Sequence, residues 1–136
     1  MTGQQIEDSI FQMLKSGSLS GIIDGKVYKF GTRPKDSVKE DAIVKFVTGL
    51  PGQIQSGTVL INIYVPDIDP YESGIYVKDI ERCITLETAA EAWFNSLTTS
   101  KSNFKFSLFQ TISTEEEPEI NQHFVSVKLK FELSTI

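Results

Sequence analysis

Apolar residues recur at helical spacing near the N-terminus. Residues 3–16 are predicted as an amphipathic helix whose apolar face comprises Ile6, Ile10, Met13 and Leu14. Thr2 and Gln5 have the spacing of a capping box, in which each side chain pairs with the other residue's free backbone donor. The helix is therefore expected to begin directly after Thr2.

A second, longer helix is predicted over residues 77–98. Its apolar face comprises Ile80, Cys83, Ile84, Ala90, Phe94 and Leu97. Trp93 directly precedes Phe94, so the two rings cannot both point squarely at the core. We expect Phe94 in the core and Trp93 at the margin between helix and sheet.

Alternating apolar and polar residues predict strands in the rest of the chain. Three strands are expected before the second helix, at residues 26–30, 42–48 and 58–66. Two more follow that helix, and their apolar faces comprise Phe104, Phe106, Leu108 and Ile112 in the first and Val125, Val127, Leu129, Phe131 and Leu133 in the second. The sequence between them, STEEEPEINQ, is expected to be an exposed acidic loop.

This order of elements predicts an α+β fold. We expect one domain, residues 1–136, built as a single mostly antiparallel sheet of about five strands with two helices packed on one face, in the order α-β-β-β-α-β-β. The strand alternation leaves several large apolar residues on the opposite face, namely Leu60, Tyr64, Phe109 and Phe124. They indicate a partner surface, although ordinary edge packing explains scattered apolar residues equally well.

Composition narrows the functional classes. Hydrophobic residues make up 40% of the chain, which is enough for a core without disulfide or metal support. The net charge is −5 with only two arginines, which argues against sequence-specific binding of nucleic acid. A lone cysteine, the absence of a signal-peptide pattern and the lack of a long apolar run favour a cytoplasmic setting without a membrane.

The strongest candidate for chemistry is the pair Asp67 and Asp69, with Glu72 close behind. Two carboxylates at a strand end can bind a divalent cation together with substrate phosphates. The pair lies between prolines at the end of a strand, and the chain has no glycine-rich turn between a strand and a helix. Turn and capping roles are therefore the favoured interpretation.

The remaining candidates also favour structural roles. The acidic run at residues 115–119 lacks the ligand pattern of a calcium loop, and His123, the only histidine, is expected at the exposed start of the last strand. Cys83 falls on an apolar helix face, where cysteine behaves as a small hydrophobe. We therefore predict no enzyme activity, no metal and no cofactor.

The loop containing Arg33, Lys35 and Asp36 is the polar segment best suited to contact a partner, with a solvated loop as the default.

Several stretches together resemble the tail terminator (tail-completion, minor tail) proteins of tailed bacteriophages and prophages. They are IEDSIFQMLKSG, GKVYKFGTRPKDSVKEDAIVKF, GTVLINIYVPDI and the terminal HFVSVKLKFEL. The resemblance implies a virion assembly protein that forms a ring, commonly a hexamer. Such a ring caps the last ring of tail-tube subunits and joins the tube to the head connector. DNA passes through it without specific binding, and the protein occupies the host cytoplasm during assembly and then the virion tail.

The alternative is a soluble α+β adaptor or ligand-binding domain that uses the Leu60, Tyr64, Phe109 and Phe124 side as a groove.

Overall fold

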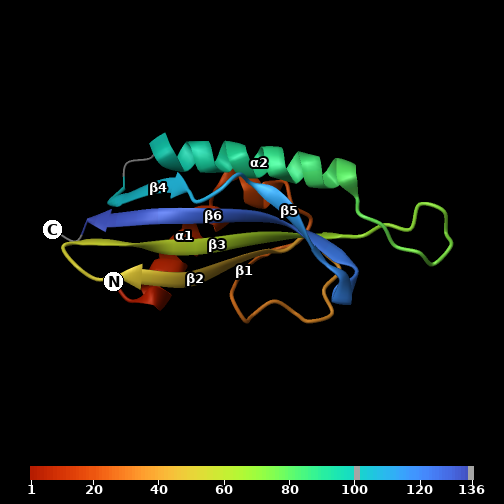
Figure 1. The fold of residues 1–136 in the computed structure, drawn as a ribbon, viewed down its shortest axis with the longest axis horizontal. Coiled ribbons are helices and arrows are strands. Elements are labelled where there is room, and N and C mark those ends of the chain that lie inside the picture. The colour runs from red at the N-terminus through yellow and green to blue at the C-terminus, as the bar shows by residue number, and fades with distance from the viewer. Residues whose placement is uncertain (100–101, 135–136) are drawn as a thin grey trace.

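The computed structural model describes residues 1–99 and 102–134. Figure 1 shows their arrangement. In chain order the elements are α1 (Gly3–Lys15), the 3₁₀ turn η1 (Ser18–Gly21), β1 (Val27–Lys29), β2 (Ala42–Leu50), β3 (Ile54–Pro66), α2 (Ile80–Thr99), β4 (Phe104–Leu108), β5 (Ser113–Glu117), η2 (Pro118–Ile120) and β6 (Gln122–Ser134).

The strands form one six-stranded sheet in the order β1-β2-β3-β6-β4, with β5 also paired to β6. The short β1 runs parallel to β2, and the other pairs are antiparallel. The long strands β3 and β6 pair along their whole length, from Ile54 opposite Ser134 to Pro66 opposite Gln122. They form the centre of the sheet.

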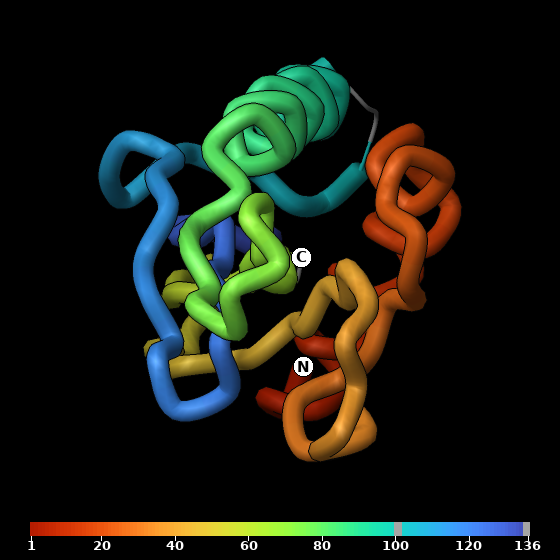
Figure 2. Tube along the Cα trace, turned by 90° about the vertical axis from the view of Figure 1, so that its right-hand side faces the viewer, coloured from red at the N-terminus to blue at the C-terminus, as the bar shows by residue number. Residues whose placement is uncertain are grey.

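Both helices pack on one face of this sheet, as Figure 2 shows from the end of the molecule. The Thr2 hydroxyl and the Gln5 side chain form the expected capping box at the start of α1. Ile6, Ile10 and Leu14 then lie at successive turns and are buried. They belong to the same buried core as alternate residues of the central strands, Val59, Ile61, Ile63 and Val65 from β3 and Val125, Val127, Leu129, Phe131 and Leu133 from β6.

One buried carboxylate completes the junction between α1 and the sheet. Glu7 is 3% exposed, and its Oε1 accepts a hydrogen bond from the Phe46 backbone N–H at 3.0 Å. The β2–β3 register shifts between Phe46 and Thr48. The backbone groups of Ala42 and Val44 pair with the β1 segment, so the Phe46 N–H points to the same side, where β1 has already ended at Lys29. The Glu7 carboxylate supplies the acceptor that β1 does not.

The predicted fold class and the order of its main elements are confirmed. Two predictions about individual elements are wrong. The acidic stretch expected as a loop begins with β5, which pairs with β6 through Ser113 to Glu117. The orientation of α2 also differs from the prediction. Trp93 is buried, at 1% exposure, whereas Phe94 is only partly buried and Ile80 and Ile84 are exposed. Relative to the predicted orientation, the helix is therefore rotated about its axis. Its buried face comprises Cys83, Leu86, Ala89, Ala90, Trp93 and Leu97.

Among the described residues, no helix is both long enough and apolar enough to cross a membrane.

Candidate interface on the open face of the sheet

The face of the sheet opposite the two helices carries most of the residues predicted to contact a partner. We call it the open face. Its outward residues lie in cross-strand rows, because residues opposite each other on paired strands point to the same side. The rows on β2, β3 and β6 are Tyr64–Phe124, Ile43–Asn62–Ser126 and Lys45–Leu60–Lys128. Leu60, Tyr64 and Phe124 are partly buried and so still present surface to solvent.

The upper part of the open face, around Tyr64 and Phe124, is held together by aromatic contacts. The rings of Tyr64 and Phe124 lie 5.6 Å apart with a tilt of 42°, within the range of favourable aromatic pairs. The Arg33 guanidinium carbon lies 4.1 Å from the Tyr64 ring centroid. The structure therefore brings Arg33, Tyr64 and Phe124 together, although they come from three distant parts of the sequence.

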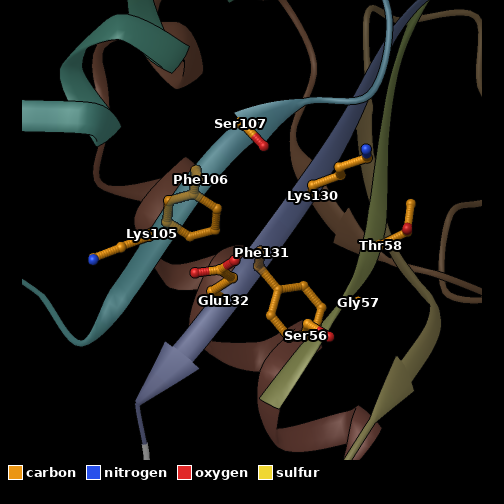
Figure 3. Close-up of a pocket in the computed structure, with 9 residues that line it drawn as sticks. All are labelled: Ser56, Gly57, Thr58, Lys105, Phe106, Ser107, Lys130, Phe131 and Glu132. Carbon is orange, nitrogen blue, oxygen red and sulfur yellow. The ribbon is translucent and has the colours of Figure 1, made fainter. Parts of the chain in front are cut away.

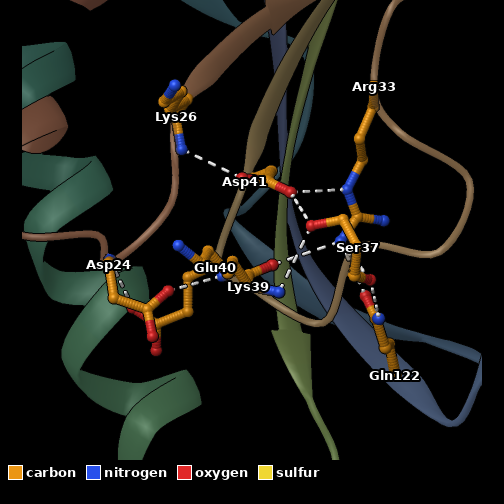
Figure 4. Close-up of polar contacts among 8 residues, drawn as sticks. All are labelled: Asp24, Lys26, Arg33, Ser37, Lys39, Glu40, Asp41 and Gln122. Atoms are coloured by element: carbon orange, nitrogen blue, oxygen red, sulfur yellow. Dashed lines mark hydrogen bonds and ion pairs between the residues drawn. The ribbon is translucent and has the colours of Figure 1, made fainter.

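Arg33 is held in place by a buried ion pair (Figure 4). Its Nε lies 2.9 Å from Asp41 Oδ2, and the two side chains are 10% and 2% exposed. Its Nη2 donates to Gln122 Oε1 at 3.0 Å and to the Lys39 carbonyl at 3.1 Å. Buried charges require this degree of pairing. The loop that contains Arg33 is thus fixed at this residue to the start of β2 and the start of β6.

Asp41 collects further donors from the same loop and from the start of β1. The Lys26 backbone N–H donates to Oδ1 at 2.9 Å, and the Ser37 hydroxyl donates to Oδ2. Burial raises the pKa of Asp41, but the hydrogen bonds from Ser37, Lys26 and Arg33 and the Arg33 charge together hold it below its ordinary value of 3.8. Asp41 is therefore ionised at neutral pH, and its charge organises the loop.

The other two loop residues predicted to contact a partner lie apart from Arg33. Lys35 and Asp36 are exposed. Asp36 lines a cavity of about 440 Å³ between the loop and β1, together with Tyr28, Pro34 and Val38. The predicted loop set is therefore split, because Arg33 stabilises the fold while Lys35 and Asp36 are available for contacts.

The lower part of the open face, around Phe109, also carries four of the described lysines. Phe109 is 56% exposed, and Lys130 Nζ lies 5.0 Å from its ring centroid. The register places Lys45, Lys105, Lys128 and Lys130 on this same face. The same alternation along the strands that predicts Leu60 on the open face also predicts these lysines on it.

A cavity of about 440 Å³ lies on this lower part, as Figure 3 shows. Its lining includes Lys105, Phe106, Lys130 and Glu132 from β4 and β6 and Thr58 from β3. The lining carries charges of both signs and the Thr58 hydroxyl, which suits a polar contact surface better than an enclosed apolar ligand site. The Phe106 ring itself packs on the core side, because Phe106 pairs with the buried Phe131.

The carboxylates after β3 have local partners. Asp67 Oδ1 lies 2.6 Å from His123 Nδ1, so His123 is not the solvent-exposed histidine expected from its position. Its side chain is only 19% exposed. Asp69 accepts hydrogen bonds from the Ser73 and Gly74 backbone N–H groups, as the turn interpretation predicted. Within the described part of the chain, no three acidic, histidine or cysteine side chains are grouped so that they could hold a metal ion.

Cys83 is buried in α2, as its position on the apolar face indicated. Burial raises the pKa of its thiol above the ordinary value of 9.0. Because the thiolate is the reactive form, we expect Cys83 to react with an aromatic disulfide reagent at least about 100-fold more slowly in the native protein than in denaturant. The Cys83→Ser variant is the blank. Equal rates in the two states would show that the thiol is accessible and reactive.

The chain matches no family model and no curated protein sequence.

Proposed function

We propose that the chain is a non-enzymatic assembly protein of a tailed phage or prophage, which caps the tail tube as a ring and joins it to the head connector. The observation that carries this proposal is the open face. Leu60, Tyr64, Phe109 and Phe124 share one side of a sheet on which no described helix packs. Apolar residues gathered on one face favour a protein that acts by contacts with other proteins.

The distribution of charge supports the same proposal. Lysines gather on the open face, with Glu115 and Glu132 as acidic neighbours there, and Lys128 pairs with Glu115. Other exposed acidic residues lie away from this face, Glu81 and Glu91 on α2 and Glu116 and Glu119 on the β5–η2 segment. In a ring, an acidic surface turned toward the channel repels phosphates, so DNA passes without being bound. The lysine-bearing face is then available to a protein neighbour, either the tail-tube protein or the connector.

A mass measurement combined with tube binding tests this proposal. We expect the protein to form a discrete closed oligomer of about six chains, or to bind as a ring to the end of purified tail tubes, because repeated modest contacts add around a closed ring. Light scattering after size exclusion, from about 1 µM to about 1 mM, measures the first. Electron microscopy of tubes mixed with the protein measures the second.

Phe109→Ser probes the open face in the same assays. Phe109 is more than half exposed, so its replacement should leave the fold stable while weakening binding to tubes by roughly tenfold or more. Lys35→Ser, on the exposed loop tip, is the matched surface control. A wild-type protein that stays monomeric throughout and leaves tube ends bare would contradict the proposed function.

The alternative is a soluble adaptor or ligand-binding domain. The cavity on the lower open face, lined in part by Phe106 and Lys130, is the observation that favours it. This alternative predicts a monomer in which a small anionic aromatic compound shifts the resonances of those two residues. The ring proposal predicts that the same resonances change on assembly instead.

A further inference from the structure

The connection between β3 and α2 forms a projecting arm, residues 67–79. In Figure 1 it extends beyond one end of the sheet, and in Figure 2 it points toward the viewer. Its base is closed by an antiparallel bridge in which Ile68 and Val77 exchange backbone hydrogen bonds of 2.9 and 2.8 Å. Its tip is held by Asp69, whose carboxylate accepts from Ser73 and Gly74. The arm is thus an ordered element with its own hydrogen bonds.

The arm presents large apolar side chains to solvent. Tyr71 is 87% exposed and Ile75 is 68% exposed. Further exposed apolar residues line the arm and the start of α2, namely Ile68, Tyr76, Val77, Ile80 and Ile84. Scattered exposed residues are normal on a protein surface, but a contiguous group on a projecting element marks a contact surface. Tyrosine is also enriched among the residues that dominate interface energies.

A second apolar group lies at the opposite end of the molecule, on the turn between β2 and β3. Leu50 and Ile54 are 70% and 60% exposed, and Val47 is 45% exposed. Residues 46–58 contain no charged side chain. A cavity of about 200 Å³ opens beside them, and its apolar lining includes Ile6, Phe46, Leu50, Pro51 and Phe131. We call this surface the hairpin end.

The arm cannot reach the hairpin end of its own molecule. The two lie at opposite ends of the 13-residue strand β3, which spans about 40 Å. Charges near the two surfaces are complementary. The arm carries Asp67, which is paired with His123, and Asp69, Glu72 and Asp79, against one lysine, Lys78. Beside the hairpin end, Lys105 and Lys130 face solvent with one acidic neighbour, Glu132. Opposite charges favour the approach of one end of the molecule to the other end of a copy.

We propose that the arm binds the hairpin end of a second copy of this chain, with Tyr71 and Ile75 packing against Leu50, Ile54 and the cavity beside them. The proposal rests on the proposed function, since it names the contact by which copies form the ring. Two different surfaces meet in this contact, so it is heterologous. A heterologous contact generates a closed ring when its rotation closes and a filament when it does not.

Complementation between two variants tests the contact. The arm variant is Tyr71→Ser with Ile75→Ser, and the hairpin variant is Leu50→Ser with Ile54→Ser. Each variant keeps one of the two surfaces intact. We expect each alone to associate at least about tenfold more weakly than wild type, and their equimolar mixture to form a dimer and nothing larger. Val38→Ser, at a residue 73% exposed and outside both surfaces, is the matched control and should associate like wild type.

Light scattering after size exclusion reads the result, and circular dichroism confirms that all variants are folded. Association of the arm variant or the hairpin variant at wild-type strength would overturn the proposal. So would a mixture that contains no dimer. An arm that pairs with another arm is recognised because the hairpin variant would then still dimerise alone.

If the wild-type protein remains monomeric at high concentration, disulfide cross-linking tests the contact between the arm and the hairpin end. Tyr71→Cys and Leu50→Cys chains, both with Cys83→Ser, are mixed with an added oxidant. A disulfide-linked heterodimer in clear excess over the two homodimers supports the contact, because a disulfide forms only between residues that approach closely. A statistical mixture, equal to that of Tyr71→Cys with Val38→Cys, overturns it.

The outcomes separate this contact from the proposed function. Complementing variants that form a dimer, with a wild-type protein that ignores tail tubes, would keep the contact and remove the tail role. Arm and hairpin variants that still form complete rings on tubes would keep the tail role and remove the contact.

Discussion

Replacing Trp93 with alanine is expected to lower the free energy of unfolding by about 3–5 kcal/mol. Trp93 is 1% exposed and is among the largest fully buried side chains in the described structure. Its ring lies directly against Gly17, where an added β-carbon would come within 2.7 Å of ring atoms. The surroundings therefore close around the indole, and its loss leaves a cavity that a tight core cannot fill by small shifts.

The neighbouring residue is the matched control. Phe94 is only partly buried, so Phe94→Ala should cost about 1–2 kcal/mol, in proportion to the smaller apolar area that it covers. Urea denaturation followed by circular dichroism measures both variants, since Trp93 is the only tryptophan and its fluorescence is lost in one of them. A Phe94→Ala cost equal to or larger than that of Trp93→Ala would contradict the observed rotation of α2.

The rotation of α2 also shows where the sequence is uninformative. The helix has apolar residues on more than one side, so periodicity alone allows a face with Phe94 or a face with Trp93. The choice depends on Gly17, the residue before η1, which lies against the indole and is far away in the chain. By contrast, Ile6, Ile10 and Leu14 of α1 have a single apolar stripe, and their burial could be predicted correctly.

The strand faces were predictable for a similar local reason. Alternation in β3 and β6 separates the buried residues from those of the open face, so the outward positions of Leu60, Tyr64 and Phe124 follow from the sequence. β5 was missed because Ser113 to Glu117 is almost entirely polar and carries no apolar alternation. It forms a strand because β6 offers its backbone along that edge, which a local pattern does not reveal.

The arrangement around Arg33 is the least local feature of the molecule. Arg33 lies 8 residues from Asp41 and 89 from Gln122, and its role depends on three segments meeting at one end of the sheet. Residue type and loop position led to the expectation of a partner contact. The burial of its guanidinium gives it a structural role, so assembly assays should use Lys35 or Asp36, which are exposed, to probe this loop.

Replacing Arg33 with methionine is expected to lower the free energy of unfolding by about 3 kcal/mol at pH 7, because it leaves the buried Asp41 carboxylate without its cation. Asp41 keeps its hydrogen bonds from Ser37 and Lys26, which limits the loss. Arg33→Lys should recover only part of it, since lysine lacks the fork of donors and the planar surface that stacks on Tyr64. Lys35→Met, an exposed change in the same loop, should stay within about 0.5 kcal/mol of wild type.

The pH dependence distinguishes an unpaired charge from a simple loss of packing. In the wild type the pKa of Asp41 lies below 3.8, so the contribution of this carboxylate to stability is full above about pH 4 and is lost as the pH falls through the lower folded-state value. In Arg33→Met, burial still raises the pKa of Asp41, while the hydrogen bond from Arg33 and the Arg33 charge, which both lower it, are gone. Protonation therefore relieves the unpaired charge at a higher pH. The stability gap between the two proteins should therefore narrow between about pH 7 and about pH 3 in urea denaturation. A gap that stays constant over this range would show that Arg33 acts through packing and not through the charge of Asp41.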